Sequence, residues 1–259
     1  MNLNPGTPED QRPECYRRQV AAARSTARRS ISLAAVVGSG IMAERLCGGN
    51  VGLALLANAI ATGGALVGLI LAFGPVSGAH LNPVVTLADA WLGGISWAAV
   101  PLYVGAQVFG AFGGVALAHG MFSEPVFSMS HRARSGGGQM LSEAVATFGL
   151  LVNIWGCVRR RPEACAFAVA AYITGAYWFT ASTSFANPAV TLARAFTDSF
   201  SGVRLADVPG FIGAQFAGAF AATVFFRWLA RPGAERVSSA ADGLLPHAAF
   251  RETDSSQEQ

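Results

Sequence analysis

The chain alternates between long apolar stretches and short polar loops. Stretches of about 20 apolar residues predict membrane-spanning helices, because a helix of that length crosses a hydrocarbon core of about 30 Å. Two further apolar stretches are too short to span a membrane, and each opens on Asn-Pro. Proline favours the first turn of a helix and breaks one that continues through it, so each short stretch is predicted to be a half-helix that begins at its asparagine. The six predicted spans cover residues 28–47, 51–74, 98–120, 139–157, 164–182 and 208–230, and the two half-helices cover 82–92 and 187–197.

The two halves of the chain repeat one another. The heptapeptide that begins at Asn82 recurs at Asn187 with six of its seven residues identical, and a Gly-Ala-Gln ending at Gln107 recurs in the same order at Gln215. Each half holds three spans, an odd number, so the halves are expected to insert in opposite orientations. The predicted fold is therefore all-α, with six transmembrane helices plus two membrane half-helices in an inverted repeat. The expected channel domain covers 18–232, with halves at about 18–120 and 138–232, between polar, disordered cytoplasmic tails at 1–17 and 233–259.

Charge supports a membrane protein and narrows its function. Charged residues make up 13% of the chain, against about 25% in soluble domains. Arginines gather before the first span, between the fourth and fifth, and after the sixth. With six spans these groups lie on one side, which the positive-inside rule makes the cytoplasm. The net charge of +3 is small, so no nucleic-acid partner is expected. The cysteines lack metal-ligand spacing, and no catalytic constellation lies near the Asn-Pro motifs, so no metal, cofactor or enzyme activity is expected.

The two half-helices predict a pore. Each is about 15 Å long, so two that enter from opposite faces meet near the midplane. Their positive dipole ends and the amides of Asn82 and Asn187 would repel cations there. The non-helical backbone before each half-helix is tolerated at membrane depth where it lines a water-filled cavity. Its carbonyls are predicted to form a ladder of acceptors for solute hydroxyls, and the ladder residues are Gly78, Ala79, His80, Thr183 and Phe185.

Over residues 36–229 the chain resembles the major intrinsic protein family, the aquaporins and aquaglyceroporins. Its two signature loops are matched by Asn82-Pro83-Val84 and Asn187-Pro188-Ala189, and Glu143 matches a buried glutamate that accepts hydrogen bonds from loop backbone. The resemblance implies a passive channel for small neutral solutes, without a cofactor. It also implies a homotetramer in the lipid bilayer of the bacterial inner membrane, with both termini cytoplasmic.

The family's four-residue constriction, the selectivity filter, can be placed by spacing from the two asparagines. It falls on Thr62, Gly175, Ser184 and Val190. Related water and glycerol channels carry an arginine where this chain has Val190, and Arg194 does not occupy that position. The opening is therefore expected to be wide and uncharged. Val190 and the segment 37–46 resemble bacterial channels of arsenic-resistance operons, which implies glycerol, urea, water and arsenite as As(OH)3 or methylated arsenicals as solutes.

Two alternatives follow from the same residues. A proton-coupled secondary transporter of a small metabolite also uses inverted repeats and broken helices, but it needs a titratable group at the midplane, and the constriction offers none. Residues 23–32 are rich in arginine where the family carries a glutamate and apolar residues. We hypothesise that this stretch is a locally frame-shifted reading of a GC-rich gene, which resequencing of the locus would test.

Overall fold

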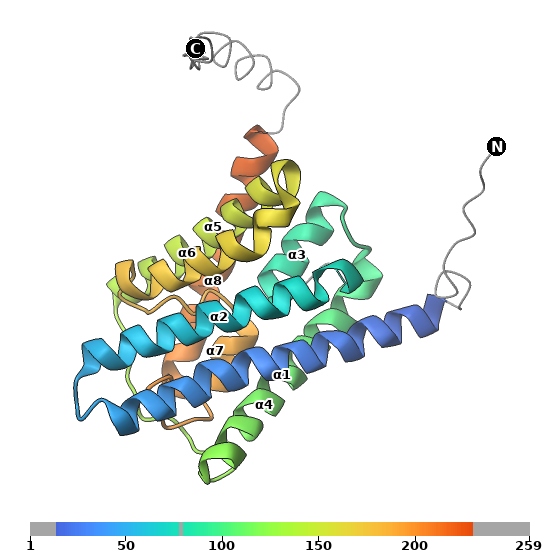
Figure 1. Ribbon diagram of the computed structural model, residues 1–259. Coiled ribbons are helices and arrows are strands. Elements are labelled where there is room, and N and C mark those ends of the chain that lie inside the picture. Colours follow the sequence, from blue (N-terminus) through green and yellow to red (C-terminus); the bar gives the residue numbers. More distant parts are fainter. Residues whose placement is uncertain (1–13, 78–79, 230–259) are drawn as a thin grey trace, which may run out of the picture. The chain divides into compact units, whose positions relative to one another are not determined.

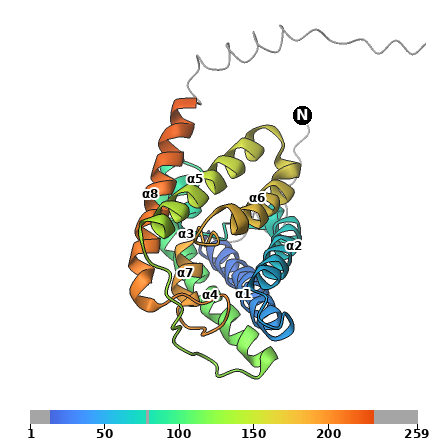
Figure 2. The same ribbon diagram turned by 90° about the vertical axis from the view of Figure 1, so that its left-hand side faces the viewer.

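The computed structural model describes residues 14–77 and 80–229, and these residues contain helices and no strand (Figures 1 and 2). Residues up to Thr223 form one compact unit, and the second unit is described only by the end of α8. Gly78, Ala79 and nearly all of the predicted tails lie outside the described residues. The helices are α1 (Glu14–Leu46), α2 (Val51–Ser77), α3 (Pro83–Leu92), α4 (Val100–Phe122), α5 (Gly137–Arg160), α6 (Cys165–Phe179), α7 (Pro188–Arg194) and α8 (Val208–Leu229).

Every predicted span and half-helix corresponds to one helix, with shifted ends. Among the described residues, four helical spans are long and apolar enough to cross a membrane, at 51–73, 97–122, 137–160 and 205–229. Neither α1, which carries arginines, nor α6, which has 15 residues, is among these four.

Two boundaries were predicted wrongly. α1 begins at Glu14, so residues 14–17 are helical rather than tail, because Pro13 precedes a run without glycine or proline. α7 ends at Arg194 and not at 197, because the chain turns there.

The two half-helices pack on α4 and against each other. α1 contacts α2 and α4, α2 contacts α6, and α4 contacts both α3 and α7. Both views show α1 and α2 side by side (Figures 1 and 2). Glycines at matching repeat positions allow two close approaches. A Cβ on Gly110 would lie 2.5 Å from the Thr26 carbonyl oxygen, and one on Gly218 would clash with that of Ala144. The inverted repeat therefore extends from sequence to packing.

Two arginines of α1 are buried, and most of their guanidinium nitrogens have no hydrogen-bond partner among the described residues. Arg28 is 0% and Arg29 is 3% exposed. All three guanidinium nitrogens of Arg28, and Nε and Nη2 of Arg29, have no hydrogen-bond partner among the described residues. The Phe73 ring lies 5.8 Å from the Arg28 guanidinium carbon. An unpaired buried charge costs several kcal/mol. The frame-shift hypothesis for residues 23–32 would remove this unfavourable arrangement, and it stays a prediction.

We expect the double substitution Arg28→Leu and Arg29→Leu to stabilise the protein. Two buried charges, neither in an ion pair among the described residues, would be replaced by apolar side chains. The measurement is the thermal unfolding midpoint in detergent, which should rise by several degrees, roughly 4 °C for each kcal/mol gained. Arg45→Leu is the matched control on the same helix, because Arg45 lies at the surface and its Nη2 is 2.8 Å from Glu124 Oε1. An unchanged or lower midpoint in the double variant would contradict the prediction.

Candidate functional site

The half-helices α3 and α7 both begin at an asparagine cap. The Asn82 Oδ1 atom accepts a hydrogen bond from the Val84 amide at 3.1 Å. The Asn187 Oδ1 atom accepts from the Ala189 and Val190 amides at 3.1 and 3.3 Å. A proline occupies the first helical position in each case, where a missing N–H costs no hydrogen bond. Each side-chain oxygen is thus used within its own helix, which turns its NH₂ group away from that helix.

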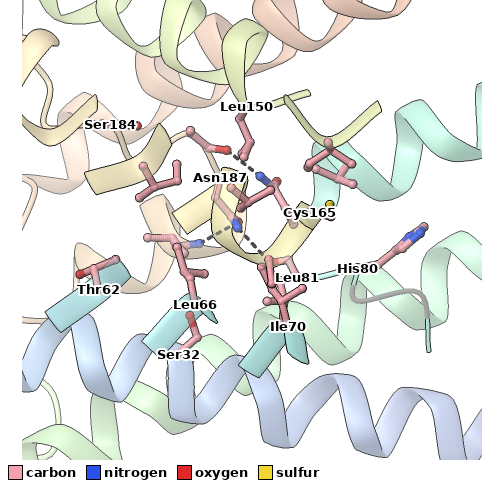
Figure 3. Close-up of a pocket in the computed structure, with 18 of the residues that line it drawn as sticks. Ser32, Thr62, Leu66, Ile70, His80, Leu81, Leu150, Cys165, Ser184 and Asn187 are labelled. Carbon is pink, nitrogen blue, oxygen red and sulfur yellow. Dashed lines mark hydrogen bonds between the residues drawn. The ribbon is translucent and has the colours of Figure 1, made fainter. Parts of the chain in front are cut away.

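The two asparagines then bind the opposite loops. Asn82 Nδ2 donates to the Ala186 carbonyl at 2.6 Å, and Asn187 Nδ2 donates to the Leu81 carbonyl at 2.9 Å. These reciprocal bonds hold the N-termini of α3 and α7 against each other, and Figure 3 shows Asn187 and its neighbours. A side-chain amide has two N–H donors. One donor of each amide therefore stays available for a molecule in the adjoining cavity.

A glutamine supports the first loop. Gln107 Nε2 donates to the Thr86 hydroxyl at 2.9 Å and to the His80 carbonyl at 2.8 Å, and Thr86 in turn donates to the Asn82 carbonyl. The predicted ladder member His80 therefore already shares its carbonyl oxygen with the protein.

The second loop repeats this arrangement and adds a carboxylate. Gln215 Nε2 donates to the Thr191 hydroxyl at 2.8 Å and to Glu143 Oε2 at 2.6 Å. Glu143 is fully buried and also accepts from the Phe185 and Ala186 amides, each at 2.8 Å. Glu143 thus fixes the backbone immediately before Asn187.

Three non-glycine residues of this second loop have left-handed backbone conformations. The φ angles are 61° at Thr183, 52° at Ser184 and 48° at Ala186. Such conformations cost about 1–3 kcal/mol each and persist only where the surroundings impose them. Besides Glu143, Arg134 holds the loop by donating to the Ser182 carbonyl and to the Thr183 hydroxyl, each at 3.3 Å. Burial lowers the pKa of the Arg134 guanidinium, and a neighbouring arginine adds to the effect.

A cavity of about 660 Å³ runs past both asparagines. Figure 3 shows Thr62 and Ser184 toward one end and His80 toward the other, with Asn187 between them. Two helices supply mainly apolar walls, and their lining residues at a spacing of four are Thr62, Leu66 and Ile70 of α2 and Val169, Ile173 and Tyr177 of α6. At the far end His80 Nε2 lies 3.4 Å from Asp89 Oδ2. The cavity therefore combines apolar walls with amide donors near its middle.

Three of the four predicted filter residues line this cavity, and one does not. Thr62, Ser184 and Val190 lie in its wall, whereas Gly175 is exposed and absent from it. The residue of α6 at this level is Tyr177, whose hydroxyl lies 3.2 Å from Thr62 Oγ1. At 100° per residue, position 175 is turned away from the face that carries residues 173 and 177. The structure thus brings Tyr177, and not Gly175, to the cavity wall, and the spacing of four between 169, 173 and 177 was the signal that could have identified Tyr177. The assignment of Gly175 to the filter stays a prediction.

The remaining predicted residues divide between wall and support. Phe185 lines the cavity, whereas Thr183 does not and is half-buried. Pro83, Val84, Pro188 and Ala189 are buried behind the lining residues. Val85 and Val190, each three residues after its asparagine, both line the cavity, as does Arg194. Sequence spacing did not indicate Arg194.

Known proteins resemble this chain in sequence. A family model described as Major intrinsic protein matches residues 11–165. Aquaglyceroporin AqpS of Rhizobium meliloti (strain 1021) is 52% identical over 216 residues, which is 83% of this chain and 91% of that relative. The probable aquaporin NIP7-1 of Arabidopsis thaliana is 46% identical over 71 residues, 27% of this chain and 25% of that protein.

A solved structure shares the fold. The X-ray structure of the aquaglyceroporin from Plasmodium falciparum superposes with a TM-score of 0.62 at 20% identity, covering 83% of this chain and 99% of that one. At this identity the likeness concerns the fold alone. Together with the sequence matches and the paired asparagine caps, it shows that the chain belongs to the major intrinsic protein family, as an aquaglyceroporin-type membrane channel for small solutes and not an enzyme.

Proposed function

We propose that this channel passively conducts glycerol, urea, water and arsenite as As(OH)3, or methylated arsenicals. The observation that carries the proposal is the pair of asparagine amides that adjoin the cavity near its middle, each with one N–H donor still available. In this proposal the protein lies in the bacterial inner membrane with both termini cytoplasmic. It assembles as a homotetramer with one pathway in each subunit, so its detergent-solubilised mass should be that of four chains.

The chemistry of the cavity suits neutral polyhydroxylated solutes. Such a solute can place its hydroxyls on the asparagine donors and its carbon face, or its compact As(OH)3 core, against residues such as Leu66 and Ile173. An ion would have to leave its hydration shell beside these apolar walls, which is costly without full replacement by protein ligands. The two helix N-termini at the asparagines oppose cations in addition.

The proposed constriction comprises Thr62, Ser184 and Val190, with Tyr177 in place of Gly175. Three of these four side chains are small, and Val190 stands where related channels have the longer arginine. The opening should therefore admit solutes at least as bulky as glycerol.

Solute flux into liposomes containing the purified protein tests the proposal. Stopped-flow light scattering with water, urea, glycerol and As(OH)3 should show permeation of all four above protein-free liposomes. An imposed proton gradient should change none of these rates and should produce no accumulation. Accumulation driven by the gradient would instead identify the proton-coupled transporter, and absence of glycerol flux would refute the proposed solute class.

We expect Asn82→Asp and Asn187→Asp to admit cations. Either change replaces an amide donor with a carboxylate between two positive helix ends, which weakens the barrier to cations. Potassium leak from liposomes should rise about tenfold, equivalent to a barrier lowered by about 1.4 kcal/mol. Asn153→Asp is the control, because Asn153 donates to Gly149 within α5 and lies outside the cavity wall. No increase in leak for either pore variant would count against this role of the asparagines.

A further inference from the structure

Arg194 is a buried charge in the wall of the pathway. It is the last residue of α7, one helical turn after Val190, and 2% of its surface is exposed. Both residues line the same cavity, together with Tyr177 and Ser184. Side chains of a helix lean toward its N-terminus. The long side chain of Arg194 can therefore lean back toward the level of Val190.

The guanidinium of Arg194 is fixed from two sides. Its Nε donates to the Ser201 carbonyl. Its central carbon lies 3.4 Å from the centre of the Phe185 ring, and Phe185 is itself held through its backbone by Glu143. A cation over the face of an aromatic ring is attracted by the ring, most strongly where water is excluded. The charge thus has a defined position in the cavity wall.

No carboxylate lies close enough to Arg194 to form an ion pair in the part of the chain that the structure describes. Glu143, the buried acid of this region, accepts from two backbone amides and from Gln215 and acts on Arg194 and Arg134 only from a longer distance. The Phe185 ring carries a second arginine, Arg134, 5.2 Å from its centre. Two arginines and one carboxylate thus surround this end of the cavity, so the sum of their charges is positive.

We propose that Arg194 provides the charge barrier of this channel from a place one turn beyond the constriction. Val190 then sets the width of the opening, and Arg194 separately excludes cations. The sequence led us to expect an opening that is wide and uncharged. In this proposal the opening is wide and its mouth carries a positive charge. This inference rests on the proposed function, because it assumes that neutral solutes pass the same constriction.

Urea and guanidinium provide the test, because they are planar, similar in size and different in charge. Their permeabilities are measured in liposomes for the unmodified channel and for Arg194→Gln, Arg194→Met and Arg194→Lys. The ratio of guanidinium to urea permeability should rise at least tenfold in the Gln and Met variants and stay low in the Lys variant, which keeps the charge. The double variant Val190→Arg with Arg194→Gln should bring the ratio back down, because it returns an arginine to the constriction.

The outcomes separate this inference from the proposed function. A low ratio in a urea-conducting Gln or Met variant would overturn the role of Arg194, as would a raised ratio in the Lys variant. A glutamine at 194 can still donate to the Ser201 carbonyl, and a methionine fills the space of the arginine. If one of these variants fails to fold, the permeability ratio of the other still tests the role of Arg194. If the unmodified channel passes neither urea nor glycerol, the proposed function fails, and potassium conductance of the same variants still tests the charge barrier.

Discussion

Val190→Arg is expected to lower glycerol and As(OH)3 permeability by about tenfold, a barrier increase of about 1.4 kcal/mol, while water continues to pass. Val190 lines the cavity beside Thr62, Tyr177 and Ser184, and an arginine there would extend into the space that the shorter side chain leaves open. The largest solutes should lose the most, since they need the full width. The new guanidinium would also lie one turn from Arg194, which adds positive charge to the same mouth.

The measurement is liposome permeability for a graded series of water, urea, glycerol and As(OH)3. Val190→Met is the matched control, because it lengthens the side chain without adding charge or donors. It should reduce glycerol flux less than Val190→Arg does. If Val190→Arg is folded and conducts water but leaves the size cutoff unchanged, Val190 does not line the constriction.

Glu143→Gln is expected to destabilise the protein strongly and to abolish most solute flux. Glu143 accepts from Phe185, Ala186 and Gln215 with both of its oxygens, and it is fully buried. A glutamine has one oxygen, so in either orientation its NH₂ group faces another donor. Each buried donor left unpaired costs about 1–3 kcal/mol. The loop that Glu143 holds also contains three left-handed non-glycine residues, so it should rearrange once this support is lost.

Thermal unfolding in detergent and glycerol flux per folded channel measure this effect. Glu124→Gln is the control, because Glu124 lies at the surface and pairs with Arg45 there. It should leave both quantities close to those of the unmodified protein. An unfolding midpoint for Glu143→Gln equal to that of the control would show that the carboxylate is not what holds the second loop.

Local signals in the sequence determined where the two half-helices begin. An asparagine followed by proline is a strong helix start, because the side chain caps the backbone and proline fits the first turn, and α3 and α7 begin there. The internal repeat pairs Gln107 with Gln215 by sequence alone, and both make the same kind of bond to a threonine of their half-helix. Runs of apolar residues likewise determined the number of helices, because the hydrocarbon core requires them.

The tertiary structure alone decided which side chains face the cavity. Spacing from Asn187 predicts Gly175 as a filter residue, but the rotation of α6 about its axis depends on its packing against α2 and α5, and the residue that it presents to the cavity is Tyr177. The tertiary structure also decided which loop carbonyl oxygens accept hydrogen bonds within the protein. The donor to the His80 carbonyl, for example, is Gln107, which lies far from it in the sequence. Arg194 shows this most clearly. Its position in the sequence lies outside the filter, and only the approach of Phe185 and Ser201 holds its charge in the pathway.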